Sequence, residues 1–467
     1  MGSESSILGG TSKNGLITMQ TIPQRRAEHS NHWSTRIRSV SSKKFALPDQ
    51  QERSRMGYWT MVIFSFLYYF RPGDIIPGIA SLHLAKITAF FAILALLLGA
   101  NRLHSRKLPI EIKIILAMFV WLVITIPFAS WRGGSFNVVF FEFARIVIVV
   151  VTLVLTVTRL VELRRLILMQ AVGVSLMTIV AVIVNNRMQG RLAGMGDGLL
   201  SNPNDLAMNI AMNWPLCLVF LLTAGGILKR SFWAVTMLVM IYALMATYSR
   251  AGFMALAVAI LICLWDFGIR GRRAYLLGIA ALGLAGMIVV APGNYVKRLE
   301  TLFGKFQEGD YDRGSAEARK ELLEKSLAIT ATHPLFGIGP GNFPSYTGLW
   351  RVTHNTYTQL SSECGIPALL LFLLLLRRTF LNLFYLRKMP RAPDKQEMHL
   401  YASALSASFV AYLVGAFFSS SAYELFPYYM VMYTTLLYRL GFPEQGREAK
   451  RLLNPTVEVR QRAYSTI

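Results

Sequence analysis

Long apolar blocks recur along most of this 467-residue chain and limit the folds open to it. Each block is about twenty residues long, which is the length that a helix needs to cross the hydrocarbon core of a bilayer. Hydrophobic residues make up 54% of the chain and charged residues only 16%. Backbone polar groups must bond to one another inside a bilayer, and a helix satisfies them within one segment. The sequence therefore predicts an all-α, polytopic integral membrane protein.

Hydropathy predicts about twelve transmembrane helices. Their approximate limits are 57–70, 78–100, 110–129, 136–158, 166–184, 205–224, 232–248, 251–267, 275–292, 357–376, 400–420 and 424–439. The first is short and ends at Arg71-Pro72-Gly73, so the opening pair also fits a tilted or re-entrant hairpin. The polar segment before it is too long for the n-region of a signal peptide, so we expect no cleaved leader.

The distribution of basic residues predicts the orientation. With the N-terminus in the cytoplasm, most of the 48 Lys and Arg residues fall on the cytoplasmic side, as the positive-inside rule requires. Both termini are therefore expected in the cytoplasm. The net charge of +23 fits this topology and attraction to anionic membrane lipids. No nucleic-acid motif or interleaved basic and aromatic platform is present, so we expect no nucleic-acid partner.

This topology divides the chain into four parts. Residues 1–56 are predicted to be a disordered, basic cytoplasmic tail, because they are polar and poor in apolar residues. Residues 57–184 form the N-terminal transmembrane helices, and 185–440 form a second membrane region with a long outer loop at 293–356. Residues 441–467 are a second cytoplasmic tail. The three cysteines lie in or beside apolar spans without metal-ligand spacing, so we expect them to be buried.

The predicted outer segments carry more arginine than the positive-inside rule allows. These residues are Arg187, Arg191, Arg250, Arg298, Arg313, Arg319 and Arg351. The planar guanidinium donates two parallel hydrogen bonds and stays charged, which suits a phosphate partner. Arg250 stands between two spans with no acidic neighbour in sequence. Its alternative roles are an interaction with a lipid headgroup and the capping of a helix C-terminus.

A polar stretch leads directly into the apolar span 357–376. It contains His354, Asn355 and Glu363. Polar groups at the edge of a bilayer are costly unless they are paired, face water or take part in chemistry, so this is the candidate active site. The alternatives are a histidine bonded to backbone near a helix N-terminus and a glutamate in a structural ion pair. Glu363 is not expected to orient His354, because nine residues along a helix place them on opposite faces.

Two other motifs are weaker candidates. Asp310-Tyr311-Asp312 resembles a metal-holding Asp-x-Asp pattern, but short acidic turns are common, and we expect no metal there. The glycine-rich stretch 337–342 has no preceding strand and contains Pro340, which excludes a dinucleotide-binding fingerprint. It is interpreted as a shaped turn that brings backbone close to a cavity or to another loop. A helix is expected before it, from about Ser315 to Thr330.

The second membrane region resembles the O-antigen ligase and polymerase superfamily of bacterial membrane glycosyltransferases. The resemblance covers roughly residues 185–440, and the first five spans match only in general pattern. It rests on four stretches in the family's order: Arg191-Leu192-Ala193-Gly194 with Asn202-Pro203-Asn204, Ser249-Arg250-Ala251-Gly252, the stretch from His333 to Phe343, and His354-Asn355 with Glu363-Cys364-Gly365.

This resemblance implies an inverting, metal-independent glycosyl transfer without a cofactor, on the periplasmic face of the bacterial inner membrane. It implies that Arg191 and Arg250 bind the pyrophosphate of a polyprenyl-linked glycan donor, and that His354 is catalytic. It also implies a lateral cavity that faces the outer leaflet. The expected acceptor is a lipid, a glycan or a protein. Further candidate substrate-binding residues are Arg187, Asn204, Arg319, Asn355 and Glu363.

Three functions stay open at this point. A ligase moves an assembled glycan from its carrier to an acceptor, and a polymerase joins carrier-linked repeat units. Both must bind the same donor and activate a hydroxyl, so the motifs do not separate them, although we favour the ligase. A non-catalytic transporter of the same lipid-linked glycan is disfavoured, because the halves show no repeat and the polar residues gather at the outer surface.

Overall fold

The computed structural model describes residues 48–75, 87, 90, 91, 93, 94, 108–195, 201–279, 281, 282, 311–390 and 392–442. The chain divides into two units, Met1–Gln51 and Glu52–Ile467. Helix α2 begins at Pro48, inside the tail that was predicted to be disordered over 1–56, and the rest of that tail lies outside the described residues. The second tail, after Phe442, also lies outside them.

The described part of the chain is almost entirely helical. Its α-helices are α2 (Pro48–Phe70), α4 (Ile110–Thr125), α5 (Arg132–Asn137), α6 (Ala144–Thr156), α7 (Leu160–Val184), α8 (Pro203–Thr223), α9 (Ile227–Ala246), α10 (Arg250–Cys263), α13 (Tyr311–Thr332), α14 (Phe343–Thr347), α15 (Thr356–Lys388), α16 (Gln396–Gly415) and α17 (Leu425–Gly441). Shorter turns are η1 (Pro72–Asp74), η4 (Ile126–Phe128), the π-helices η5 (Val138–Phe143) and η6 (Leu264–Ile269), and η8 (Pro393–Lys395). Strands β1 (Arg187–Met188) and β2 (Arg191–Leu192) form one antiparallel hairpin.

Eight described helices are long and apolar enough to cross a membrane. They are Ile110–Phe128, Arg132–Thr156, Leu160–Val184, Pro203–Thr223, Ile227–Ala246, Arg250–Ile269, Thr356–Lys388 and Pro393–Gly415. Each overlaps one predicted span, so the prediction of a multi-pass helical membrane protein is confirmed. Of the other predicted spans, 57–70 lies in α2 and 424–439 in α17, which has 17 residues. Spans 78–100 and 275–292 lie largely outside the described residues.

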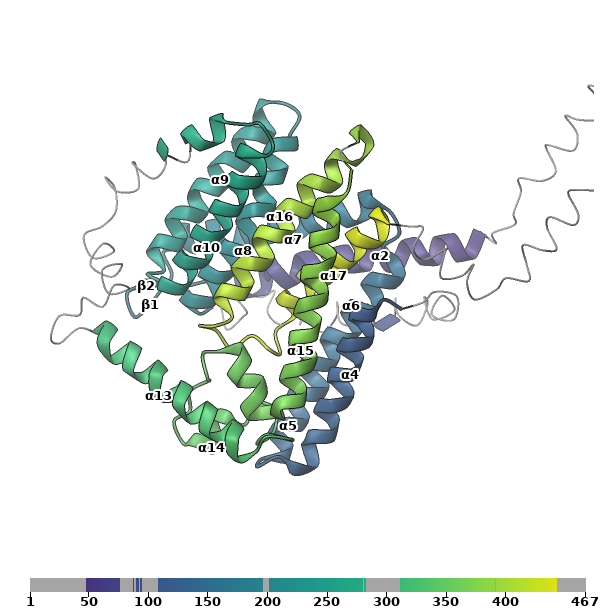
Figure 1. Ribbon diagram of the computed structural model, residues 1–467. Coiled ribbons are helices and arrows are strands. Elements are labelled where there is room, and N and C mark those ends of the chain that lie inside the picture. The colour runs from purple at the N-terminus through teal and green to yellow at the C-terminus, as the bar shows by residue number, and fades with distance from the viewer. Residues whose placement is uncertain are drawn as a thin grey trace, which may run out of the picture. The chain divides into compact units, whose positions relative to one another are not determined.

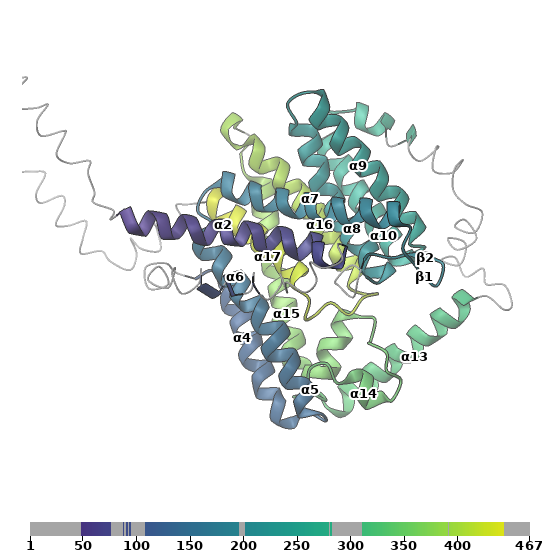
Figure 2. The same ribbon diagram turned by 180° about the vertical axis from the view of Figure 1, so that it is seen from behind.

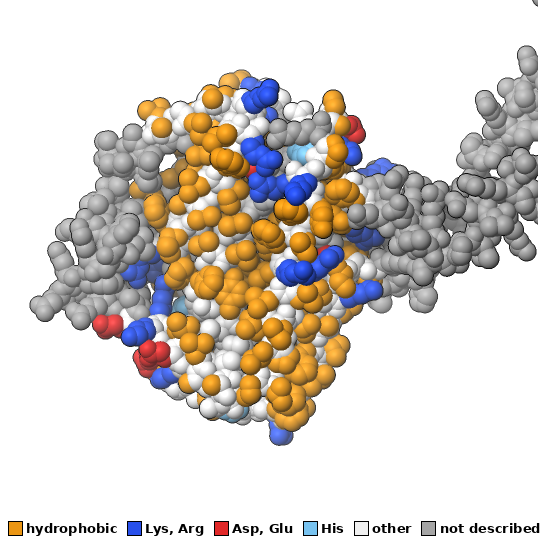
Figure 3. Space-filling model, in the orientation of Figure 1, with side chains coloured by type: hydrophobic (Ala, Val, Ile, Leu, Met, Phe, Trp, Pro, Cys, Tyr) orange, Lys and Arg blue, Asp and Glu red, His pale blue; other side chains and the backbone are white. Residues whose placement is uncertain are grey.

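Helix α9 has one exposed apolar face and one buried face. Val235, Leu238 and Tyr242 follow one helical face and are 58%, 66% and 58% exposed. Met237 and Met240, on the other face, are buried. Apolar side chains exposed at this spacing are those that lipid would cover. Hydrophobic side chains are also spread widely over the described part of the face in Figure 3.

Helices α8, α10 and α16 pack against one another, and α9 packs against α8 (Figures 1 and 2). The start of α10 approaches α8 closely, because a Cβ at Gly252 would collide with Ala207. Helix α15 contacts α4, α13 and α17. The predicted helix at 315–330 lies within α13, which confirms that interpretation.

Helix α15 differs from its predicted span 357–376 in two ways. It continues through Arg377 and Arg378 to Lys388, because apolar residues such as Leu383 and Leu386 keep a buried face. It is also broken at Gly365, whose φ of 83° and ψ of 171° are not helical. There the amide of Ile366 donates to the carbonyl oxygen of Pro334 at 2.8 Å. Residues 356–364 therefore form a separate helical start, against which a loop packs.

Candidate functional site

The β1–β2 hairpin places Arg191 against the ends of two transmembrane helices. Arg191 Nε donates to the carbonyl oxygen of Thr247 at 2.8 Å, and its Nη2 donates to Asn204 Oδ1 at 2.7 Å. The same Asn204 oxygen accepts from Ser249 Oγ at 3.1 Å. Two of the four sequence motifs are therefore joined through one amide oxygen.

The second of these motifs places Arg250 at the first position of α10. Ser249 is the N-cap, and its Oγ accepts from the amide of Gly252 at 3.2 Å, which satisfies one of the free amides at the helix start. Gly252 lets the start of α10 lie against Ala207 of α8. Arg250, which is half-buried, therefore lies beside the helix start that carries Asn204.

Arg187 lies apart from this network. Its Nε donates to Asn185 Oδ1 at 2.9 Å and its Nη1 to the carbonyl oxygen of Gly190 at 3.0 Å. Asn185 is the C-cap of α7 and Gly190 lies in the turn of the hairpin, and Arg187 is exposed. These contacts hold the turn between the two strands, which indicates a structural role.

The His-Asn motif lies at the start of α15. Asn355 is the N-cap, and its Oδ1 accepts from the amides of Tyr357 and Thr358 at 2.9 and 3.1 Å. His354, directly before it, is half-buried and has a left-handed φ of 52°. Non-glycine residues in that conformation are uncommon and cluster at functional sites. The cap therefore fixes the backbone from which His354 projects.

His354 lies in a positively charged environment. Burial, together with the positive charges of Arg319 on α13 and Arg351, lowers the pKa of His354 to about 4. Each of these influences disfavours the imidazolium form. The imidazole is therefore neutral at physiological pH and has a lone pair that can accept a proton. The structure thus brings Arg319, a candidate from sequence, into the neighbourhood of His354.

The segment between α16 and α17 connects the two clusters. Thr353 and Ser420 share a hydrogen bond of 2.8 Å between their hydroxyls, and Thr356 Oγ1 donates to the carbonyl oxygen of Ser419 at 2.6 Å. Ser419 Oγ in turn donates to Asp205 Oδ1, next to Asn204, at 3.1 Å. The arginine network and the start of α15 therefore lie at the same end of the helices.

The sequence left a structural ion pair open for Glu363, but the contacts described for its carboxylate are of another kind. Its Oε2 accepts from the amide of Gly341 at 3.0 Å and from Tyr423 OH at 2.7 Å, and its Oε1 accepts from the amide of Phe343 at 3.3 Å. The contacts described for the carboxylate are therefore with neutral donors, and none is with Arg250. This geometry indicates that Glu363 positions the loop between α13 and α14.

The same loop is bound to α15 and to the segment before α5. The amides of Ile338 and Gly339 donate to the carbonyl oxygens of Ser362 and Glu363 at 3.0 and 2.8 Å. On its other side, the carbonyl oxygen of Ile338 accepts from the amide of Ser130 at 2.9 Å. Gly337 has a φ of 65°, and a Cβ there would collide with the backbone of Glu363. The interpretation of 337–342 as a shaped turn that approaches another loop is confirmed.

Several residues of this region were not singled out from the sequence. Asp205, Ser419, Tyr423 and Glu424 come from segments whose polar character was visible only as short interruptions of apolar spans. Glu424 directly precedes α17 as its N-cap. Three successive serines at 419–421 were the one signal that could have identified this segment.

The sequence also drew attention to the three cysteines, the Asp310-Tyr311-Asp312 pattern and His333. Cys217, Cys263 and Cys364 are buried and free, as expected. Asp310 and the side chain of Asp312 lie outside the described residues, so the metal pattern there is not described. His333 bonds locally, with its Nδ1 2.9 Å from Thr332 Oγ1.

Comparison with known families agrees with the motifs. Residues 235–373, less than a third of the chain, match the family model described as O-antigen ligase. The matched segment contains Arg250, Arg319, His354, Asn355 and Glu363, and it excludes the hairpin with Arg187 and Arg191. No curated protein matches the chain. The match supports a ligase- or polymerase-type function in glycan biosynthesis. Residues 235–373 of this multi-pass membrane protein are therefore similar to the O-antigen ligase family.

Proposed function

We propose that this protein is a membrane glycosyltransferase that moves a glycan from a polyprenyl-pyrophosphate carrier to an acceptor hydroxyl. One observation carries the proposal. The Arg191–Asn204–Ser249 network lies at the same end of the helices as His354, which has Arg319 and Arg351 as charged neighbours. Segments far apart in sequence supply cationic groups and a neutral imidazole at that end. These are the groups that such a transfer requires.

The donor's pyrophosphate is the proposed ligand of Arg191 and Arg250. Arg191 is oriented by two neutral oxygen acceptors, and Arg250 is fixed by the N-cap of its helix. Negative charge develops on the leaving pyrophosphate as the sugar–phosphate bond breaks. Cationic donors that are already in position lower the barrier for that step.

His354 is the proposed general base. The acceptor's hydroxyl oxygen attacks the anomeric carbon from the side opposite the pyrophosphate, and its proton passes to the imidazole. A new glycosidic bond forms, the bond to the pyrophosphate oxygen breaks, and the carrier pyrophosphate leaves. The configuration at the anomeric carbon is inverted, and no metal is required.

The arginines near His354 would make the pKa of this base depend on whether the donor is bound. In the free protein, Arg319 and Arg351 help to lower the pKa of His354. A bound pyrophosphate would offset their positive charge and raise that pKa toward its ordinary value. The base would then become stronger when the donor is in place, which couples proton transfer to donor binding.

The location of the reaction follows from the positive-inside pattern. We infer that the end with Arg250 and His354 faces the periplasm, in the inner membrane, and that both termini are cytoplasmic. The lateral cavity that the resemblance implies would open there toward the outer leaflet. The acceptor of the transferred glycan is a lipid, a glycan or a protein that carries the attacking hydroxyl.

The test is a transfer assay with purified full-length protein and its host's lipid-linked glycan. His354→Ala and Arg250→Ala should each lower transfer by about 10²-fold or more while expression and membrane insertion stay normal. His333→Ala and Arg132→Ala are matched controls at the same end and should keep full transfer. Full activity of either test variant would overturn the assignment.

The same assay separates the two modes of transfer by product length. A ladder of longer lipid-linked chains from the donor alone identifies a polymerase. No product until a second acceptor is added, followed by a single transfer, identifies a ligase. EDTA should leave the rate unchanged, and strong inhibition would contradict a metal-independent mechanism.

A further inference from the structure

A second cluster of arginines lies at the other end of the same helices. Helix α10 begins at Arg250 and continues through η6 to Ile269, and α15 begins after His354 and ends at Lys388. The C-terminal ends of both, and the start of α16, surround a cavity of about 430 Å³. This cavity is therefore separate from the proposed catalytic site.

The cavity is strongly basic. Its lining includes Arg270, Arg272, Arg273 and Arg387, with His399 and a single carboxylate, Asp266. A tight turn brings the first three together, since the amide of Arg273 donates to the carbonyl oxygen of Gly268 at 2.8 Å. Figure 3 shows Lys and Arg side chains gathered at this end of the molecule amid hydrophobic surface.

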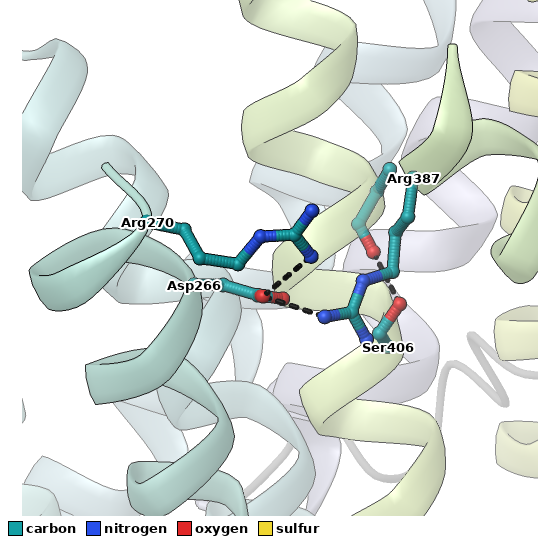
Figure 4. Close-up of polar contacts among 5 residues, drawn as sticks. Asp266, Arg270, Arg387 and Ser406 are labelled. Carbon is teal, nitrogen blue, oxygen red and sulfur yellow. Dashed lines mark hydrogen bonds and ion pairs between the residues drawn. The ribbon is translucent and has the colours of Figure 1, made fainter.

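Asp266 orients two of the arginines. Its Oδ1 lies 2.5 Å from Arg387 Nη2 and 3.9 Å from Arg270 Nη1 (Figure 4). One carboxylate compensates one positive charge, so four arginines leave a net charge of about +3 in the lining. A guanidinium has five N–H donors, and Asp266 holds that of Arg387 through one described contact. The cavity is therefore suited to an anion with several oxygen acceptors.

An apolar cavity of about 290 Å³ lies beside the basic one. Arg270 and Arg387 line both. The rest of its wall is mostly hydrophobic, from Ile262, Phe380, Leu383, Phe384, Phe409 and Val410. Lys388, also in the wall, lies with its Nζ 4.1 Å from the centre of the Phe384 ring. An occupant of both cavities needs an anionic head and an apolar chain.

We propose that these two cavities bind one anionic phospholipid. Its phosphate occupies the arginine cavity, and an acyl chain lies along the apolar cavity between α10, α15 and α16. Basic pockets between transmembrane helices are known to hold anionic lipid headgroups. An acidic peptide or a free phosphate would use the arginines but would leave the apolar cavity unfilled. The lipid would join three helices that also carry the catalytic end.

The experiment is native mass spectrometry of the full-length protein in neutral detergent, with lipid added in steps. One dioleoylphosphatidylglycerol should stay bound at concentrations at least tenfold lower than dioleoylphosphatidylcholine. Arg272→Gln with Arg273→Gln should weaken phosphatidylglycerol binding by about tenfold or more. Val410→Trp narrows the apolar cavity, leaves every arginine in place and should weaken binding as well.

The matched control is Lys229→Gln with Arg230→Gln. These exposed residues carry the same two charges at the same end of the bundle and line neither cavity. This variant should bind phosphatidylglycerol as the wild type does. Equal loss in the control, or equal retention of phosphatidylcholine, would overturn the proposal. Competition by inorganic phosphate at equal concentration would show that the site binds phosphate without a lipid chain. That result would also overturn the proposal.

Discussion

Glu363 and Asp266 are both buried carboxylates, 2% and 8% exposed, but they lie at opposite ends of the bundle and have different partners. Glu363 accepts from two backbone amides and a tyrosine hydroxyl. Asp266 binds two arginines that line a cavity. The first carboxylate therefore holds backbone, whereas the second holds charged side chains.

The two carboxylates therefore have different roles: one positions a loop, and the other orients arginine side chains. Neutral donors hold Glu363 in one geometry, so it can position the loop at the end where His354 lies. The arginines around Asp266 outnumber it, so it orients cations and leaves a positive surface for a ligand. Variants at the two acids should therefore affect different properties of the protein.

The largest effect is expected for Glu363→Ala. It leaves the amides of Gly341 and Phe343 and the hydroxyl of Tyr423 without their acceptor, at about 1–3 kcal/mol for each buried group. Thermal unfolding of the purified protein should show a loss of about 3 kcal/mol or more, and transfer should fall at least tenfold. Glu363→Gln keeps an acceptor oxygen and should lose less. An unchanged unfolding temperature and rate would show that the loop does not depend on this carboxylate.

Asp266→Asn should have a smaller effect on stability and none on transfer. Its arginine partners lose a charged acceptor, but Arg387 and Arg270 are 30% and 46% exposed, so solvent compensates in part. We expect a loss of about 1–2 kcal/mol in the free energy of unfolding. Phosphatidylglycerol binding should strengthen, because the cavity becomes more positive. A loss of transfer as large as that of Glu363→Ala would break the comparison.

Removal of a single hydroxyl from Tyr423 or from Tyr428 tests whether the contact with Glu363 matters for transfer. Tyr423→Phe removes a donor to Glu363, and Tyr428→Phe removes a hydrogen bond of similar burial, 2.9 Å long, to the carbonyl oxygen of Ala422. Each should cost about 1 kcal/mol in unfolding. Only Tyr423→Phe should slow transfer, because only that hydroxyl contacts the loop-holding carboxylate. Equal rates in the two variants would count against a positioning role for Glu363.

The smallest effect is a shift in the pH profile. Since the pKa of His354 in the free protein is about 4, the imidazole is neutral above that pH, and kcat/KM should fall only as the pH approaches 4. Arg319→Gln removes a charge that lowers this pKa, so the acid limb should move to higher pH. Arg272→Gln, at the other end, should leave it in place. Steady-state rates between pH 4 and 8 test this, and identical limbs in all three proteins would contradict the assignment of His354 as the base.

The path of the chain was largely predictable from sequence. Apolar blocks such as 110–129 and 205–224 closely match observed helices, because a bilayer-length apolar run has few alternatives to a helix. The predicted topology also placed Arg191, Arg250 and His354 on one side, and hydrogen bonds join their segments at one end of the helices. The extension of α15 to Lys388 was missed, because charged residues such as Arg377 interrupt the hydropathy signal without interrupting the helix.

The sequence by itself determined a helical membrane protein, its similarity to the O-antigen ligase family and the candidate residues for chemistry. Only the tertiary structure decided their partners: Asn204 between Arg191 and Ser249, Glu363 under the 337–343 loop, and Asp266 among arginines. Hydropathy and motif order depend on local composition, which a sequence states directly. Hydrogen bonds between residues tens or hundreds of positions apart depend on how the helices pack, which local composition does not specify.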